Sequence, residues 1–338
     1  MYQRKLDIIK QPIPIILGTF ALLVALLTAR AVAAPLPGEV VGDMFSTVGV
    51  WFNGLWGLVG SVAFSVVMTM ASAVVFTRII SRYSISVIRS FLPLTLYGIM
   101  VCGVLFAVCS PALQLSLFLL AHSAELMVGS FKRQSMFDDV MCASFYAGLA
   151  TLLVPDLVYV SLLVVYQWVL YRRSMRECIA GGILLLLPIV PAEFVGWLTG
   201  GSVGDITSGW LEALSPLGNF SWDSLVQACG GVFGTALLVI LVLLGAVSVI
   251  MFLASYMSMR TRARKIHLYF TIVFLVGVAM LFLGASPVVS IGVLGMGIIP
   301  LVHTYFVRRP GVATTLVYIL LLALVVVRSL VLMQNILI

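Results

Sequence analysis

Long apolar runs separated by short polar connections extend along almost the whole chain. A transmembrane helix needs about 20 mostly apolar residues, and these runs have that length. They lack the alternating pattern, roughly 10 residues long, of an outer-membrane barrel strand. We therefore predict an all-α, polytopic transmembrane bundle of about eleven spans. The expected spans are residues 12–33, 54–77, 91–109, 112–130, 139–154, 156–171, 178–198, 226–258, 266–284, 287–307 and 312–334.

The composition also favours a membrane protein without a soluble domain. Of the 338 residues, 62% are hydrophobic and 9% are charged, whereas soluble domains carry roughly 25% charged residues. We predict a single transmembrane domain over residues 1–338, with longer outer segments at 34–53 and 199–224. Within the second segment, residues 206–214 are expected to form a short interfacial helix.

The basic residues set the expected orientation. All Lys and Arg residues except Arg30 and Arg328 lie in alternate connections, and most Asp and Glu residues lie in the others. Because cytoplasmic loops are rich in Lys and Arg, we predict a cytoplasmic N-terminus and a periplasmic C-terminus. The expected location is the bacterial inner membrane, with multiple passes. The net charge of +7 then requires no nucleic-acid partner.

The beginning of the chain has two interpretations. Basic residues precede an apolar run at 12–28, and Ala31-Val32-Ala33 resembles a signal-peptide cleavage site. The run is long for a signal peptide, and Arg30 stands directly before the site. These features favour a retained first span over a cleaved signal.

Candidate chemistry on the outer side involves acids and arginines. Glu39 and Asp43 lie four residues apart in the first outer segment, where they are candidate catalytic acids or simply solvated residues. Arg30 and Arg328 are candidates to bind the phosphate of a lipid, because the guanidinium group suits phosphate geometry. Glu193 is a third candidate for that site, as a structural partner of the arginines.

Polar residues also occur inside the predicted spans. His122 and Glu125 are three residues apart, so they share one face of a helix. An ionisable residue within the membrane is a candidate functional group; the alternative is an interfacial or helix-packing pair. His267 and His303 lie near the predicted cytoplasmic ends of their spans and are expected to be interfacial.

Glycines mark expected packing sites and one possible break. Gly230 and Gly234 form a G-x-x-x-G pattern, which allows close helix contact within the chain or with a second copy. Gly292, Gly295 and Gly297 precede Pro300 and are a candidate interruption of the tenth span.

The sequence predicts no metal site and no cofactor. The five cysteines lie inside or beside apolar runs and form no C-x-x-C pair, so we expect them to be small buried apolar residues. The chain also lacks Walker A, G-x-S-x-G and H-E-x-x-H motifs. No motif therefore points to an ATPase, a serine hydrolase or a zinc protease.

Several short motifs occur in a fixed order within residues 85–97 and 113–191. They are Arg89-x-Phe91-Leu92-Pro93, Phe137-Asp138, Ala143-Ser144-Phe145, Gly148-Leu149-Ala150 and Pro155. In these motifs the chain resembles a family of uncharacterised polytopic inner-membrane proteins of Bacteroidota. This family implies a membrane-embedded helical fold and no established activity.

The short hairpin at 139–171 is similar, more distantly, to multi-spanning glycosyltransferases that use polyprenyl-phosphate sugars. Those enzymes have acids in the first outer loop and an interfacial helix after the first span. The resemblance implies that Glu39 or Asp43 is a catalytic acid. It also implies that Arg30 or Arg328 holds the lipid phosphate.

Three functions from different classes remain open. We expect first a structural or accessory subunit of a cell-envelope membrane complex, because strong motifs are lacking and glycine-rich helix faces favour packing with other subunits or a second copy. The alternative is a glycosyltransferase-like enzyme acting on a lipid-linked substrate at the outer leaflet. A transporter or flippase is the third, and it requires a central polar cavity. Membrane lipids are expected partners in every case.

Overall fold

Helices make up all the regular structure in the described part of the computed structural model. The structure describes residues 13–33, 45–83, 90–104, 110–130, 137–198, 200–202, 204–214, 221–283, 285–309 and 311–337. The helices are α1 (Ile13–Ala33), α3 (Thr47–Gly54), α4 (Leu58–Arg82), α5 (Leu92–Gly103), α6 (Pro111–Gly129), α7 (Phe137–Leu153), η3 (Pro155–Leu157), α8 (Val158–Leu170), α9 (Met175–Leu186), α10 (Ile189–Leu198), α11 (Asp205–Leu214), α12 (Trp222–Ala228), α13 (Val232–Ala254), η4 (Tyr256–Ser258), α14 (Thr261–Leu283), α15 (Pro287–Arg308) and α16 (Val312–Leu337).

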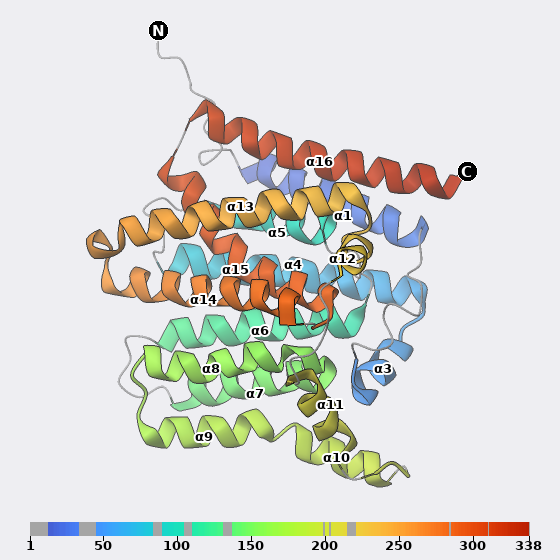
Figure 1. Ribbon diagram of the computed structural model, residues 1–338, viewed down its shortest axis with the longest axis vertical. Coiled ribbons are helices and arrows are strands. Elements are labelled where there is room, and N and C mark those ends of the chain that lie inside the picture. Colours follow the sequence, from blue (N-terminus) through green and yellow to red (C-terminus); the bar gives the residue numbers. More distant parts are fainter. Residues whose placement is uncertain are drawn as a thin grey trace.

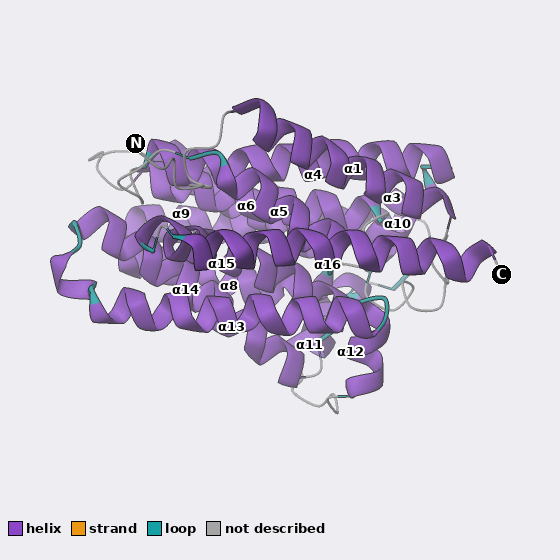
Figure 2. Cartoon of the chain, turned by 90° about the horizontal axis from the view of Figure 1, so that it is seen from above, coloured by secondary structure: helices purple, strands orange, loops and turns teal. Residues whose placement is uncertain are grey.

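The long helices lie side by side with similar axis directions. They extend from α1 and α16 at one edge of the bundle to α9 and α10 at the other (Figure 1). The view from above shows that the bundle is more than one helix deep, with α13 and α12 on the face away from α1 and α4 (Figure 2). Helices α4, α6, α7 and α9 are successive neighbours in this arrangement.

Helix α15 lies at the centre of the bundle. It contacts α4, α5, α6, α12, α13 and α14, and 94% of its most apolar stretch is buried. Small residues let the neighbours approach closely. A side chain at Gly295 would meet Met100, and one at Gly297 would place its first carbon 2.6 Å from the backbone nitrogen of Phe274. The possible break at these glycines does not occur, because α15 continues through Pro300.

Within the described residues, seven helical stretches are long and apolar enough to cross a membrane, with α9 and α10 counted together as one. This number is consistent with a multi-pass integral membrane protein. The stretches are Leu58–Arg82, Pro111–Gly129, Met175–Leu198, Val232–Ala254, Thr261–Leu283, Pro287–Arg308 and Val312–Val331. Three shorter apolar helices cover Ile16–Leu26, Leu92–Gly103 and Pro155–Leu170. Each of the expected spans therefore contains a helix, although not all of these helices reach spanning length.

The expected eighth span, 226–258, is wrong as a single helix. The backbone turns at Gly230 and Gly231, whose φ angles are 69° and 106°, a left-handed region that glycine adopts without steric cost. The Gly231 amide donates to the carbonyl of Val226 and so closes the end of α12. The G-x-x-x-G pattern therefore begins in a turn instead of following one helix face.

Short helices are anchored to the bundle at the end opposite the basic connections. Asn53 at the end of α3 accepts a hydrogen bond from the Ala112 amide, 2.9 Å away, in the first turn of α6. Helix α11 confirms the helix expected at 206–214. Its Trp210 donates to the carbonyl of Thr151 at 3.2 Å, so this side chain binds protein as well as lying near the surface.

The contact between α14 and α15 generates a test of the fold. Gly297→Ala should lower the free energy of unfolding by about 1–3 kcal/mol, because the new methyl group would collide with backbone atoms of α14. The matched control is Gly196→Ala in α10, where no atom lies within 4 Å of the added carbon. Thermal unfolding in detergent should show a lower Tm for the first variant alone; equal Tm values would contradict the packing.

Candidate functional site

The basic residues gather at one end of the bundle. Arg78 and Arg82 end α4, and Arg262 begins α14. The connections from α8 to α9, from α13 to α14 and from α15 to α16 lie at this same end (Figure 1). These connections contain Arg172, Arg173, Arg260 and Arg309. Arg176 lies in the first turn of α9, and Arg308 ends α15. We call this the basic end. The charge pattern of the sequence therefore corresponds to a real separation of charge in space.

A cavity of about 380 Å³ opens at the basic end. It lies where α4 and α6 finish and where α7 and α14 start. The residues that line it are Arg78, Arg82, Tyr83, His122, Glu125, Leu126, Gly129, Asp139 and Arg262. Most of these side chains are polar, so the cavity is suited to a charged or hydrogen-bonding ligand.

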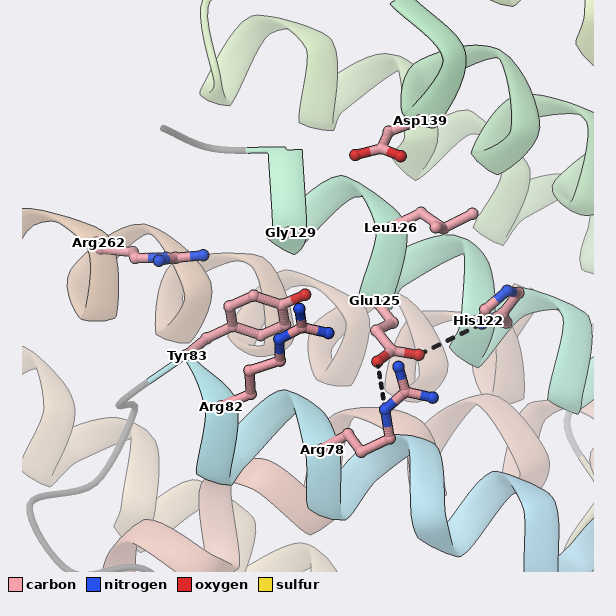
Figure 3. A pocket seen from close by; sticks show the side chains of 9 residues that line it. All are labelled: Arg78, Arg82, Tyr83, His122, Glu125, Leu126, Gly129, Asp139 and Arg262. Carbon is pink, nitrogen blue, oxygen red and sulfur yellow. Dashed lines mark hydrogen bonds and ion pairs between the residues drawn. The ribbon is translucent and has the colours of Figure 1, made fainter. Parts of the chain in front are cut away.

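A buried carboxylate forms one wall of the cavity. Glu125 Oε1 lies 3.0 Å from Arg78 Nε, and Oε2 lies 3.3 Å from His122 Nδ1 (Figure 3). The Glu125 side chain is only 4% exposed, whereas that of Arg78 is 52% exposed. A buried charge needs partners of this kind to offset its lost hydration. Oε2 thus shares a hydrogen bond with His122, while Oε1 lies within ion-pair distance of Arg78 but makes no hydrogen bond among the described residues.

Tyr83 and two arginines form the opposite side of the cavity (Figure 3). The Arg262 guanidinium lies 4.6 Å from the centroid of the Tyr83 ring, and that of Arg82 lies 5.9 Å away. Such placement over an aromatic ring is favourable for a cation. Burial raises the pKa of Tyr83 above its usual value, although Arg82 opposes this shift. The phenol therefore stays neutral near pH 7 and can donate a hydrogen bond.

The cavity has more positive than negative charge. Arg78 is matched by Glu125. Neither Arg82 nor Arg262 makes an ion pair with a carboxylate among the residues that the structure describes. Asp139 is the remaining acid in the lining. Arg262 Nη2 also donates to the carbonyl of Val128 at 3.2 Å, so this guanidinium is partly engaged in capping α6. The charges of Arg82 and Arg262 still exceed the single charge of Asp139, and this balance favours an anion.

Other basic side chains at the same end cap helices. Lys265 Nζ donates to the carbonyl of Leu170 at 2.6 Å. Arg173 donates to the Ser130 hydroxyl, and Arg308 donates to the Ser255 hydroxyl. Cations are stabilising at helix C-termini. The hydrogen bonds of these side chains stabilise the fold, whereas the Arg82 side chain is exposed.

The structure brings His122 and Glu125 together, as their spacing predicted. The His122 ring also stacks parallel to Phe118, with centroids 6.0 Å apart, and lies 5.3 Å from Tyr146. Sequence reasoning missed Arg78, Arg82, Tyr83, Asp139 and Arg262 as residues of this site. The one local signal was Arg78, which lies a full helical turn before Arg82 and within the long apolar helix α4.

The outer candidate residues have different outcomes. Glu39 and Asp43 lie outside the described residues, and Arg30 is in the last turns of α1, where only the backbone is described. Arg328 is 2% exposed within the bundle. Its Nη1 donates to the Cys102 carbonyl at 3.0 Å, and its Nη2 donates to the Cys229 carbonyl.

Glu193 lies far from Arg328. Helices α10 and α16, which carry them, lie at opposite edges of the bundle (Figure 1). Glu193 accepts hydrogen bonds from the Gly204 amide at 3.0 Å and from the Thr207 amide and hydroxyl, both at 2.7 Å. These contacts stabilise the start of α11. The structure therefore does not combine Glu193 and Arg328 into one site.

The two histidines expected at the interface are buried instead. His267 and His303 are both 0% exposed, in α14 and α15. The His267 ring lies 5.3 Å from the Phe252 ring of α13. The prediction was wrong because α13, α14 and α15 pack together near their basic ends and cover both side chains.

Metal ligation finds no support in the described part of the chain. No group of three or more His, Cys, Asp or Glu side chains there could hold a metal ion. Cys102 and Cys229 are buried, as expected, whereas Cys142 is exposed on α7. Comparison with protein-family models, curated proteins and solved structures found no match for this chain.

A double-mutant cycle tests the ion pair in the cavity. Arg78→Gln should destabilise the protein more than Arg82→Gln, because only Arg78 compensates a buried carboxylate. Combining Arg78→Gln with Glu125→Gln should recover part of the loss, with a coupling free energy of about 1–2 kcal/mol. Chemical denaturation in detergent measures these differences. Zero coupling, with equal effects of the two arginine variants, would show that the pair contributes nothing.

Proposed function

We propose that this chain is a multi-pass protein of the bacterial inner membrane that binds a phosphate-bearing anion in the cavity at its basic end. The observation that carries the proposal is the pair of cavity arginines, Arg82 and Arg262, without a carboxylate partner among the described residues. Guanidinium groups bind phosphate oxygens through paired hydrogen bonds.

The basic end faces the cytoplasm in this proposal. Its support is the concentration of arginines at one end of the helices, which is the usual arrangement for cytoplasmic loops. The seven long helices span the bilayer together with α1, α5, α7 and α8, which gives eleven crossings. An odd number of crossings places the two termini on opposite sides, so with the basic end in the cytoplasm the N-terminus is inside and the C-terminus is in the periplasm.

Binding is favoured over catalysis by the state of Glu125. A general base needs a free oxygen within reach of a substrate proton, but both Glu125 oxygens contact Arg78 or His122. We therefore assign the chain the role of an accessory subunit of a cell-envelope membrane complex, with anion binding at its cytoplasmic end. The exposed apolar surface of α9 and α10 suits contact with lipid or with another subunit.

The orientation can be measured by cysteine labelling. In a variant without native cysteines, Arg260→Cys should react with an impermeant maleimide only after the cells are permeabilised. Ser202→Cys, at the other end of the bundle, should react in intact spheroplasts. Both positions are exposed, so each cysteine is accessible from its own side of the membrane. The reverse labelling pattern would overturn the proposed orientation.

Anion binding can be measured with inorganic phosphate as the probe. The protein in phosphatidylcholine nanodiscs should bind phosphate in calorimetric titrations at fixed ionic strength. Arg82→Gln should weaken binding about tenfold, the effect of losing one charged hydrogen-bond donor. Arg260→Gln removes the same charge at the same end but outside the cavity lining, and it should leave the affinity nearly unchanged. Equal losses in both variants would indicate a diffuse charge effect and no site.

A further inference from the structure

Helix α6 has one narrow exposed line in an otherwise buried surface. Leu115, Phe118, His122 and Leu126 are partly exposed, while nearly all other residues of α6 are buried. Their spacing of three or four residues places them on one face. We call these four residues the α6 strip. Its last two members, His122 and Leu126, line the cavity, so the strip leads directly into it.

Helices α4 and α7 flank the strip and add apolar surface beside it. Both pack against α6. On α4, Val67, Met70 and Val74 are about half exposed and precede Arg78 on the same side of the helix. On α7, Tyr146 and Leu149 are partly exposed, and Tyr146 contacts the His122 ring. Three neighbouring helices therefore carry apolar surface towards one charged cavity.

The geometry points to an anionic phospholipid of the cytoplasmic leaflet as the occupant, an inference that rests on the proposed anion-binding function. We propose that the lipid phosphate lies between Arg82, Arg262 and Tyr83, and that one acyl chain lies along the α6 strip. The charge of the cavity complements the phosphate. Basic pockets between transmembrane helices on the cytoplasmic side bind anionic headgroups in this way.

The length of the strip agrees with this occupant. Leu115 and Leu126 are separated by eleven residues, which span about 16 Å at 1.5 Å per residue. One leaflet contributes about 15 Å of a hydrocarbon core about 30 Å thick. The strip therefore extends from the headgroup level to about the middle of the bilayer, the depth that one acyl chain occupies. A free phosphate would use the cavity and leave the strip uncovered.

A photoreactive lipid tests the inference. The probe is phosphatidic acid with a diazirine in its acyl chain, added at low mole fraction to phosphatidylcholine nanodiscs. Crosslinks should concentrate on α4, α6 and α7 beside the strip. Arg82→Gln should reduce this labelling several-fold, whereas Arg260→Gln should not. Phosphatidylcholine with the same diazirine should label the strip no more than the exposed faces of α9 and α13.

A second pair of variants tests the acyl-chain position without changing charge. Leu115→Trp fills the far end of the strip and should reduce crosslinking several-fold, while phosphate affinity stays unchanged. Leu243→Trp adds the same side chain to an exposed position on α13 and should change neither quantity.

The outcomes separate the two proposals. Arg82-dependent phosphate binding with crosslinks spread evenly around the bundle would overturn the lipid inference and leave the anion site standing. If Arg82→Gln changed neither the phosphate affinity nor the lipid crosslinking, both the anion site and the lipid inference would be overturned. Strip labelling that depends on both Arg82 and Leu115 would establish the lipid as the occupant.

Discussion

The burial of α15 is the constraint on which the rest of the structure depends. A helix covered on nearly all sides has no room for large side chains wherever a neighbouring backbone comes close. Glycine at 297 permits the approach of α14, and Gly295 permits contact with α5. Helices α4, α6 and α14 all contact this central helix. Their ends therefore meet at one place, and that meeting forms the cavity.

Charges inside the bundle are stabilised in two different ways. Glu125 is held by side chains, Arg78 and His122, whose ionic contacts offset the loss of hydration. Arg328 is held by the backbone, through carbonyls near the ends of α5 and α12, where the helix dipoles are negative. Because Arg328 is occupied in this way, it serves the packing of the short helices. Arg82 has no comparable partner among the described residues, and this difference separates the structural arginine from the one proposed to bind a ligand.

The candidate site shows which contacts can be predicted from residue spacing along the sequence. The three-residue spacing of His122 and Glu125 was enough to predict that they share a helix face, and they do contact each other. The spacing contained no information about Arg78, because that partner comes from another helix nearly fifty residues earlier. Gly230 and Gly234 show the opposite error. Their spacing matched a helix-packing motif, but two positive φ angles place the motif's start in a turn.

The sequence by itself determined the helical, membrane-embedded class of this protein, the approximate position of each long helix and the separation of basic from acidic connections. These properties follow from apolar run length and charge order, which are local along the chain. The tertiary structure alone decided which helix is central, which histidines are buried and which arginines remain available. Those properties depend on contacts between residues far apart in sequence, and the free energy of such contacts exists only once the helices have packed.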